Sequence, residues 1–470
     1  MEFVLACSGT RGDCEPSVAV GRELQRRGHR VRIAIPPNLV EFAESVGLDA
    51  VAYGPNADQL WTADFFRNFS KNFFRKFWTI REPVKIIQEL WQPVMLYWSD
   101  MDAVLTPMAY GADLLCHGLF FQGVAVNVAE YYDIPFATLD YFPVRPNRRT
   151  APPLIPARLF QWGLAAYEGF GCWMNRRPED AQRRRLGLPK TRKFTSQRLA
   201  ELGALQIQTY DELIFPGLKE DWADLYETRP FVGTLSMGLE TNADDEVLSW
   251  IAAGTPPICF GFGSMPLESA ADTVTMIAKV CAELGERALV CSGWTDYSQG
   301  PQFDHVRVVG PVSYEKIFPH CRAVVHHGGS GTTAAAALRA GVPSLILWMA
   351  GDQPFWGAQL KRLRVGTARK LISTTPDQLL SDLRQICTPE YETRARELGA
   401  RMIPRAESVR LAADHLERFA RKRASTRPGT GRAVGQPDTS SHPGSGGQPD
   451  NIRSLAERRA AGGDVRHRPV

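Results

Sequence analysis

Residues 323–348 constrain the fold more than any other stretch, because four different local patterns follow one another there. The apolar run 323–325 predicts a buried strand, and a glycine-rich turn follows it. The alanine-rich run 332–340 predicts a helix, since alanine has the highest helix propensity. Gly341 ends that helix, and residues 344–348 predict the next strand. This succession indicates a parallel α/β sheet.

The glycine turn has the features of a phosphate site. Glycines let the backbone approach a bulky anion, and the first turn of a helix presents unpaired N–H groups at its positive end. We expect these residues to bind a diphosphate: His327, Gly329, Ser330, Gly331 and Thr332. Asp352 and Gln353 follow the next strand, where carboxylate and amide groups suit sugar hydroxyls. The alternative is a plain tight turn beside packed histidines.

A second segment with chemical potential, Arg11-Gly12-Asp13, follows the strand predicted over residues 3–7. Asp13 can take a proton from an acceptor hydroxyl, and Arg11 can brace a diphosphate by charge-assisted hydrogen bonds. Asp13 is equally suited to cap the next helix, which is predicted to start at Pro16 and to continue over residues 18–27. Asp352 is a second candidate for the base.

Three motifs together resemble the nucleotide-sugar signature of the UDP-glycosyltransferase superfamily: His327-Gly-Gly-Ser-Gly-Thr, Arg-Ala-Gly-Val-Pro and Gly-Asp352-Gln353-Pro-Phe. The groups that look most similar are sterol glucosyltransferases, glycopeptide-antibiotic glycosyltransferases and actinobacterial (mycobacterial) lipid and glycopeptidolipid glycosyltransferases. The resemblance implies the GT-B fold, which is α/β with two doubly wound, Rossmann-like domains facing a cleft. It also implies inverting, metal-independent transfer with Asp13 as the base.

The resemblance assigns further donor contacts residue by residue. Ser264, in Gly261-Phe-Gly-Ser, matches a serine that contacts the donor phosphate, and the Val312 main chain matches a position that binds the base. Plant relatives carry a tryptophan about where Val309 stands, so we expect Trp294 to stack on the nucleobase instead. Gly12 and Arg11 are expected on the donor side. A plain turn at Ser264 and a sheet-capping Trp294 are the alternatives.

Residues 61–98 interrupt the strand–helix alternation with a basic aromatic run. Phenylalanines recur every four residues beside lysines and arginines, which predicts one or two helices that cover an acceptor pocket or touch an anionic bilayer. The residues that we expect to do so are Phe69, Phe73, Phe77 and Trp78. An aromatic face packed on the N-terminal domain is the alternative.

Composition sets the domain plan and the compartment. The chain has 470 residues, enough for two domains, and a net charge of +4. Its nine cysteines are scattered and are interpreted as reduced core thiols, so we expect a cytoplasmic protein. Peripheral contact with the inner face of the plasma membrane is kept as an option. The predicted parts are an acceptor domain (1–228), a linker (229–245), a nucleotide-sugar domain with a return helix (246–423) and a disordered tail (424–470).

We therefore predict an inverting hexosyltransferase that uses a UDP- or dTDP-sugar and a lipid or glycopeptidolipid acceptor. No cofactor, metal or nucleic acid is expected, and Asp100-Met101-Asp102 is interpreted as a solvated turn or helix cap rather than a metal site. The alternatives are transfer to a small secondary metabolite or antibiotic aglycone, a sugar-nucleotide epimerase, and a non-catalytic module that binds nucleotide sugars.

Overall fold

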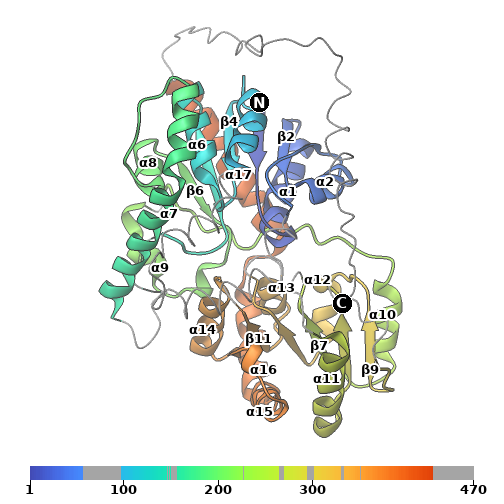
Figure 1. The fold of residues 1–470 in the computed structure, drawn as a ribbon. Coiled ribbons are helices and arrows are strands. Elements are labelled where there is room, and N and C mark those ends of the chain that lie inside the picture. The colour runs from blue at the N-terminus through green and yellow to red at the C-terminus, as the bar shows by residue number, and fades with distance from the viewer. Residues whose placement is uncertain are drawn as a thin grey trace, which may run out of the picture. The chain divides into compact units, whose positions relative to one another are not determined.

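The computed structural model describes residues 1–56, 97–145, 147, 149, 156–225, 227–263, 269–293, 301–329, 333–349 and 351–426. The expected disordered tail lies almost wholly outside these residues, as do 61–96 of the predicted insertion. The described chain contains two six-stranded sheets, each wholly parallel and each flanked by helices (Figure 1). This confirms the α/β, doubly wound class.

The first sheet has the strand order β3-β2-β1-β4-β5-β6. Its strands are β1 (Glu2–Ala6), β2 (Arg30–Ile35), β3 (Asp49–Ala52), β4 (Leu114–His117), β5 (Phe136–Asp140) and β6 (Leu205–Gln208). The helices of this half are α1 (Arg11–Arg26), α2 (Val40–Glu44), a helix over residues 97–108, α6 (Gln122–Tyr132), α7 (Ala157–Arg185), α8 (Thr195–Glu201) and α9 (Leu218–Asp221).

The second sheet has the strand order β12-β11-β10-β7-β8-β9. Its strands are β7 (Ile258–Gly261), β8 (Ala288–Cys291), β9 (Val306–Val309), β10 (Ala323–His326), β11 (Ser344–Trp348) and β12 (Gly366–Lys370). Its helices are α10 (Asp244–Ala252), α11 (Ala270–Leu284), α12 (Tyr314–Ile317), α13 (Thr333–Arg339), α14 (Gln353–Leu363), α15 (Pro376–Ile386) and α16 (Pro389–Arg401).

Alternation along each strand explains why both faces of the sheets are covered. In β1, Phe3 and Leu5 enter one hydrophobic cluster, while Val4 and Ala6 enter the cluster on the other face. Successive side chains of a strand point to opposite faces, so a strand that is apolar throughout needs helices on both sides. This is why the short apolar runs of the sequence predicted the strands well.

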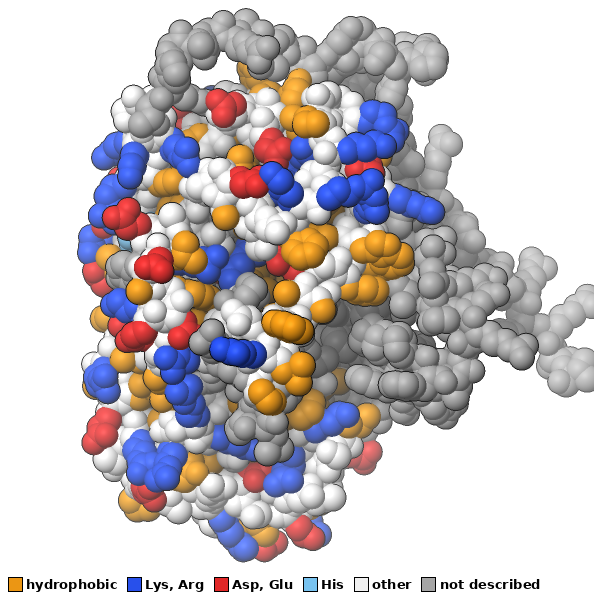
Figure 2. All heavy atoms as spheres, turned by 90° about the vertical axis from the view of Figure 1, so that its left-hand side faces the viewer, with side chains coloured by type: hydrophobic (Ala, Val, Ile, Leu, Met, Phe, Trp, Pro, Cys, Tyr) orange, Lys and Arg blue, Asp and Glu red, His pale blue; other side chains and the backbone are white. Residues whose placement is uncertain are grey.

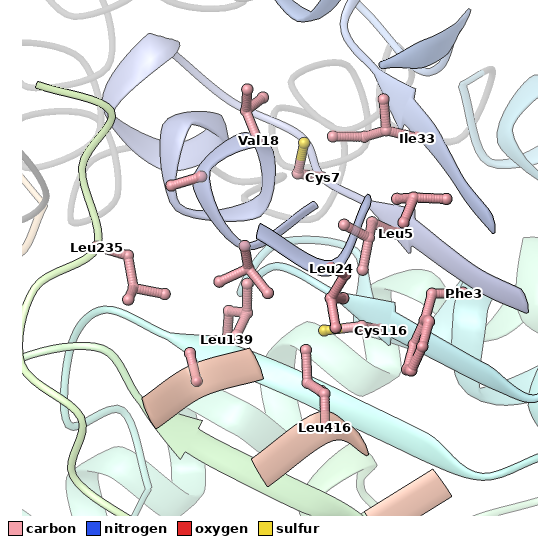
Figure 3. Close-up of a cluster of buried hydrophobic side chains, with 14 of the residues drawn as sticks. Phe3, Leu5, Cys7, Val18, Leu24, Ile33, Cys116, Leu139, Leu235 and Leu416 are labelled. Atoms are coloured by element: carbon pink, nitrogen blue, oxygen red, sulfur yellow. The ribbon is translucent and has the colours of Figure 1, made fainter. Parts of the chain in front are cut away.

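The last helix, α17 (Arg405–Thr426), packs on the helix layer of the first sheet. Its Leu416 lies in the same cluster as Phe3, Leu24 and Leu139 (Figure 3), and the Arg27 guanidinium donates to Asp414 at 2.7 Å. The helix thus ends at residue 426, slightly beyond the predicted start of the tail.

Two local predictions were wrong. Helix α1 begins at Arg11 rather than near Pro16, because Thr10 and Asp13 cap it earlier. Asp102 is neither solvated nor in a turn, since it is buried in the helix over 97–108 and its carboxylate accepts from Arg185 at 2.6 Å.

His117 ends β4 and is fully buried. Its Nδ1 donates to the Gly118 carbonyl at 2.9 Å, so Nε2 of the neutral ring accepts from the Tyr53 hydroxyl at 3.1 Å. Burial lowers the pKa of this histidine to about 4, although the bond to Gly118 opposes the shift. These contacts give His117 a structural role.

We predict that folding stability falls as the pH is lowered from about 6.5 to 4. The unfolded His117 binds a proton in this window and the folded one does not, which costs roughly 3 kcal/mol of unfolding free energy. Urea denaturation of His117→Gln, whose amide can replace both hydrogen bonds, should show a shallower pH dependence than the wild type. An unchanged slope would contradict the assignment.

Candidate active site

The loops at the carboxyl ends of β7, β8 and β10 touch one another through glycines. A Cβ atom on Gly293 would lie 1.7 Å from the carbonyl oxygen of Gly263, and one on Gly263 would lie 3.0 Å from His327 Cε1. A Cβ on Gly329 would lie 2.5 Å from His327 Nε2. Glycine at these positions therefore allows three loops to converge on one histidine.

His327 is almost fully buried directly after β10. Burial lowers its pKa to about 4, and the Gly261 carbonyl, as an acceptor for the ring N–H, acts the other way. Its Nδ1 has no hydrogen-bond partner among the described atoms. A neutral imidazole with an unpaired buried nitrogen can give a ligand one hydrogen bond, as predicted for the donor diphosphate.

The neighbouring His326 has a different role. Its Nδ1 accepts from the Gly328 N–H at 3.1 Å, and burial lowers its pKa to about 3. Gly328 has a φ of 86°, and a Cβ there would lie 2.6 Å from Ile346 of β11. His326 therefore holds the turn that sets the position of His327.

Asp352 and Gln353 lie at the start of α14, directly after β11. Asp352 Oδ2 accepts from the Trp356 indole N–H at 2.9 Å, and Gln353 Oε1 accepts from the Met349 N–H at 2.8 Å. A Cβ on Gly328 would lie 3.4 Å from Gln353 Cβ, so this loop adjoins the one that carries His327. The predicted contacts of both side chains with the sugar remain predictions.

The other donor residues differ in what the structure describes. Val312, after β9, is half-buried against the apolar cluster between β9 and α12, and its main-chain role with the base remains a prediction. The remaining predicted donor residues lie outside the described chain: Ser264, Trp294, Ser330, Gly331 and Thr332. The aromatic residues proposed for acceptor or membrane contact also lie outside the described chain: Phe69, Phe73, Phe77 and Trp78.

Asp13 lies in the first turn of α1, at the carboxyl edge of the first sheet. Its Oδ2 accepts from the Thr10 N–H at 2.6 Å and from the Thr10 hydroxyl at 2.9 Å. Oδ1 accepts no hydrogen bond from a described residue. Asp13 is therefore a helix cap through one carboxylate oxygen, which leaves the other available for a proton.

The segment around Asp13 is tightly fitted. Gly9 has a φ of 115°, and a Cβ there would lie 2.4 Å from Asp13 Oδ2. Arg11 lies on the outside of the helix, where it pairs with Glu15 at 3.4 Å and stacks on the Phe42 ring. The predicted donor-side roles of Arg11 and Gly12 remain predictions.

Tyr141 is a site residue that sequence reasoning missed. It directly follows β5, is buried, and its hydroxyl has no partner in hydrogen-bonding geometry within the described chain. The hydroxyl nevertheless lies close enough to Asp13 to lower the pKa of that carboxyl group. Burial first, and then the charges of Asp13 and Asp352, raise the pKa of Tyr141. Its position after a buried strand was the available signal.

The electrostatics of Asp13 favour a base. Burial raises the pKa of this carboxyl group, and the nearby Tyr141 hydroxyl together with the hydrogen bonds from Thr10 only partly offsets the rise. A carboxylate with a raised pKa is a stronger proton acceptor than an ordinary surface aspartate. The first sheet thus supplies a proton acceptor, and the second supplies a converging set of anion-compatible loops.

Comparison with known proteins identifies the family. The glycosyltransferase family 28 N-terminal domain matches residues 3–149, and the erythromycin biosynthesis protein CIII-like C-terminal domain matches residues 295–417. An uncharacterized glycosyltransferase of Mycobacterium leprae is 52% identical over 428 residues, which cover 91% of this chain and 99% of the relative. The chain belongs to the GT-B glycosyltransferases. The resemblance to UDP-glycosyltransferases is thereby confirmed.

More distant relatives agree on the fold. A sterol 3-beta-glucosyltransferase of Arabidopsis thaliana is 27% identical, covering 89% of this chain and 68% of the relative. The calicheamicin glycosyltransferase CalG4 superposes with a TM-score of 0.65 at 17% identity, covering 91% of this chain and 99% of CalG4. The glycosyltransferase VinC, solved with dTDP, has a TM-score of 0.57 at 18% identity, covering 90% of this chain and 100% of VinC.

We predict that Gly263→Ala weakens nucleotide binding about tenfold or more, because the added methyl group would displace the His327 ring. Gly285→Ala is the matched control. It has a similar positive φ in the same half of the chain, but nothing lies within 4 Å of its Cβ position. Calorimetric titration with UDP and dTDP should separate the two, and equal affinities would contradict the proposed donor loop.

Proposed function

We propose that this glycosyltransferase transfers a hexose, with inversion, from a nucleotide-diphosphate sugar to an acceptor hydroxyl. The proposal depends on the surroundings of the Asp13 carboxyl group. One oxygen is fixed by Thr10, the other accepts no bond from the described chain, and burial raises its pKa. This arrangement provides an oriented base with a free proton-accepting atom.

The reaction follows as one balanced displacement. Asp13 takes the proton of the acceptor hydroxyl while that oxygen forms a bond to the anomeric carbon. The bond from the anomeric carbon to the diphosphate oxygen breaks, and the diphosphate leaves with the electron pair. Attack opposite the leaving group inverts the anomeric centre. The neutral His327 would stabilise the charge on the diphosphate by donating a hydrogen bond.

The donor proposed is a UDP- or dTDP-hexose. The converging glycine loops after β7, β8 and β10 suit a diphosphate, and a structural neighbour, VinC, was solved with dTDP. Asp352 and Gln353 would then contact the sugar hydroxyls from the start of α14. Titration of the protein with UDP and with dTDP, beside His327→Ala, tests this site. Saturable binding that the variant loses supports it, and binding of neither nucleotide contradicts it.

The acceptor proposed is a hydrophobic, lipid-like molecule. A sterol glucosyltransferase among the relatives supports a lipid, whereas the calicheamicin enzyme among the structural neighbours supports a small secondary metabolite. The basic aromatic run of residues 61–98 favours the lipid. Transfer assays with a lipid extract and with small phenolic aglycones decide between them. Transfer to soluble aglycones alone would refute the lipid proposal.

Asp13→Asn should reduce transfer by about 10²–10⁴-fold, because the amide cannot accept the hydroxyl proton. Nucleotide affinity should stay unchanged, since Asp13 belongs to the acceptor side. The assay measures kcat/KM with sugar donor and calorimetric affinity for the free nucleotide. Unchanged transfer would remove Asp13 as the base and leave Asp352 as the remaining candidate.

Tyr141→Phe should move the acidic limb of the kcat/KM profile to higher pH. The Tyr141 hydroxyl lowers the pKa of Asp13, so its removal raises that pKa and more of the base is protonated at a given pH. Phe120→Leu, which alters a ring packed edge-on against Tyr141, is the control that keeps the hydroxyl. A profile that shifts equally in both variants would assign Tyr141 a packing role only.

A further inference from the structure

Helix α7 gathers large apolar side chains that the fold leaves exposed. Leu159 is 61% exposed, Trp162 76%, Phe170 42% and Trp173 51%. Isolated exposed apolar residues are common on protein surfaces, but a contiguous row on one element indicates an interaction site. Two tryptophans at such exposure on one helix are the strongest sign of this kind in the described chain.

The exposed residues lie on one face of α7. Their spacing is three or four residues from Leu159 through Trp162, Ala166 and Phe170 to Trp173, which keeps them in a single stripe about 21 Å long. On the opposite side, Glu168 accepts from the Ser196 N–H at 2.8 Å, and further along the helix the buried Gln182 donates to Asp102 at 2.9 Å. The helix is therefore anchored to the domain by one side and offers an apolar row on the other.

The same stripe continues as a basic one. Arg177 and Arg184 follow Trp173 at four and eleven residues, so they extend the exposed face by about one and about three turns. Arg158 and Arg176 lie exposed beside it, and no described carboxylate pairs with any of these four arginines. The positive charge on this face is therefore not fully neutralised by the described part of the chain.

Two of the three acidic residues of α7 are engaged away from the stripe. Glu168 accepts from the Ser196 N–H and hydroxyl, both at 2.8 Å, and Glu179 pairs with Arg198. Asp180 lies half-buried on the stripe between Arg177 and Arg184, so it offsets one of the four positive charges. Figure 2 looks onto the side of the molecule where α7 runs, and orange hydrophobic side chains gather there with blue Lys and Arg around them. The face combines apolar area with net positive charge.

We propose that this face of α7 docks on an anionic lipid bilayer. Tryptophan and leucine suit the boundary between headgroups and acyl chains, and unpaired arginines are attracted by anionic headgroups. The helix would lie in the plane of the surface rather than cross it, and no helix among the described residues is long and apolar enough to span a bilayer. Docking would bring the enzyme to the membrane that holds the proposed lipid acceptor. This inference rests on the proposed function only for that reason to dock.

The test uses the full chain and sedimentation with vesicles of phosphatidylcholine, with and without phosphatidylglycerol. We expect binding only to the anionic vesicles, and weaker binding as salt rises from ~0.1 M to ~0.5 M. The double variant Trp162→Ser, Trp173→Ser should bind roughly tenfold or more weakly, because it removes most of the inserted apolar area. Arg177→Glu with Arg184→Glu should abolish the preference for anionic vesicles.

Ile372→Ser is the matched control, since Ile372 is 63% exposed but lies outside α7. It should bind like the wild type. Equal binding to neutral vesicles, or full binding by the tryptophan variant, would overturn the proposal. So would a change of oligomeric state in that variant without a change in vesicle binding, which would make the face a contact between two copies.

Calorimetry with UDP and dTDP on the same variants separates this inference from the proposed function. The tryptophan variant should bind nucleotide as the wild type does, because its substitutions lie outside the donor loops. Vesicle binding in a protein that binds neither nucleotide would support the docking face and count against the proposed transfer. Nucleotide binding without any vesicle binding would support the proposed transfer and overturn the docking face.

Discussion

A parallel sheet that is apolar on both faces must be covered on both, and this requirement organises the molecule. In β10, Ala323 and Val325 enter one cluster and Val324 enters the other, as in β1 and β7. Helices therefore fill both sides, and polar groups are left to the sheet edges. Ligands of such sheets collect at the carboxyl ends of the strands, where the loops are free to carry chemistry. Both Asp13 and His327 lie there.

The fold was predictable because its signals are local. Strand β11 was placed to the residue, since it is a short apolar run between breakers. The errors occurred where side-chain contacts override such patterns. Pro16 suggested a helix start, but the bonds between Thr10 and Asp13 start the helix five residues earlier. Asp102 looked like a solvated acid, and only the tertiary fold brings Arg185 to it from 83 residues away.

The candidate site was predictable in its motifs and not in its geometry. The glycine turn and its histidine were visible as a motif, yet the sequence does not show that Gly263 and Gly329 meet at His327 and that Gly293 packs on Gly263. Tyr141 was invisible, because a tyrosine after a strand is usually core packing. Its relation to Asp13 arises from the adjacency of β1, β4 and β5 in the sheet, which is a long-range property.

Asp13 shows how one side chain can serve the fold and the chemistry together. The sequence left capping and catalysis as equal alternatives, and the structure shows that the cap uses Oδ2, so the proposed proton transfer can use Oδ1. Capping by Oδ2 fixes the rotamer of Asp13. Glycine at position 9 keeps that rotamer possible, because a Cβ atom there would collide with Oδ2. A base held in this way loses little conformational entropy when the acceptor binds. The cap therefore supports the proposed chemistry instead of competing with it.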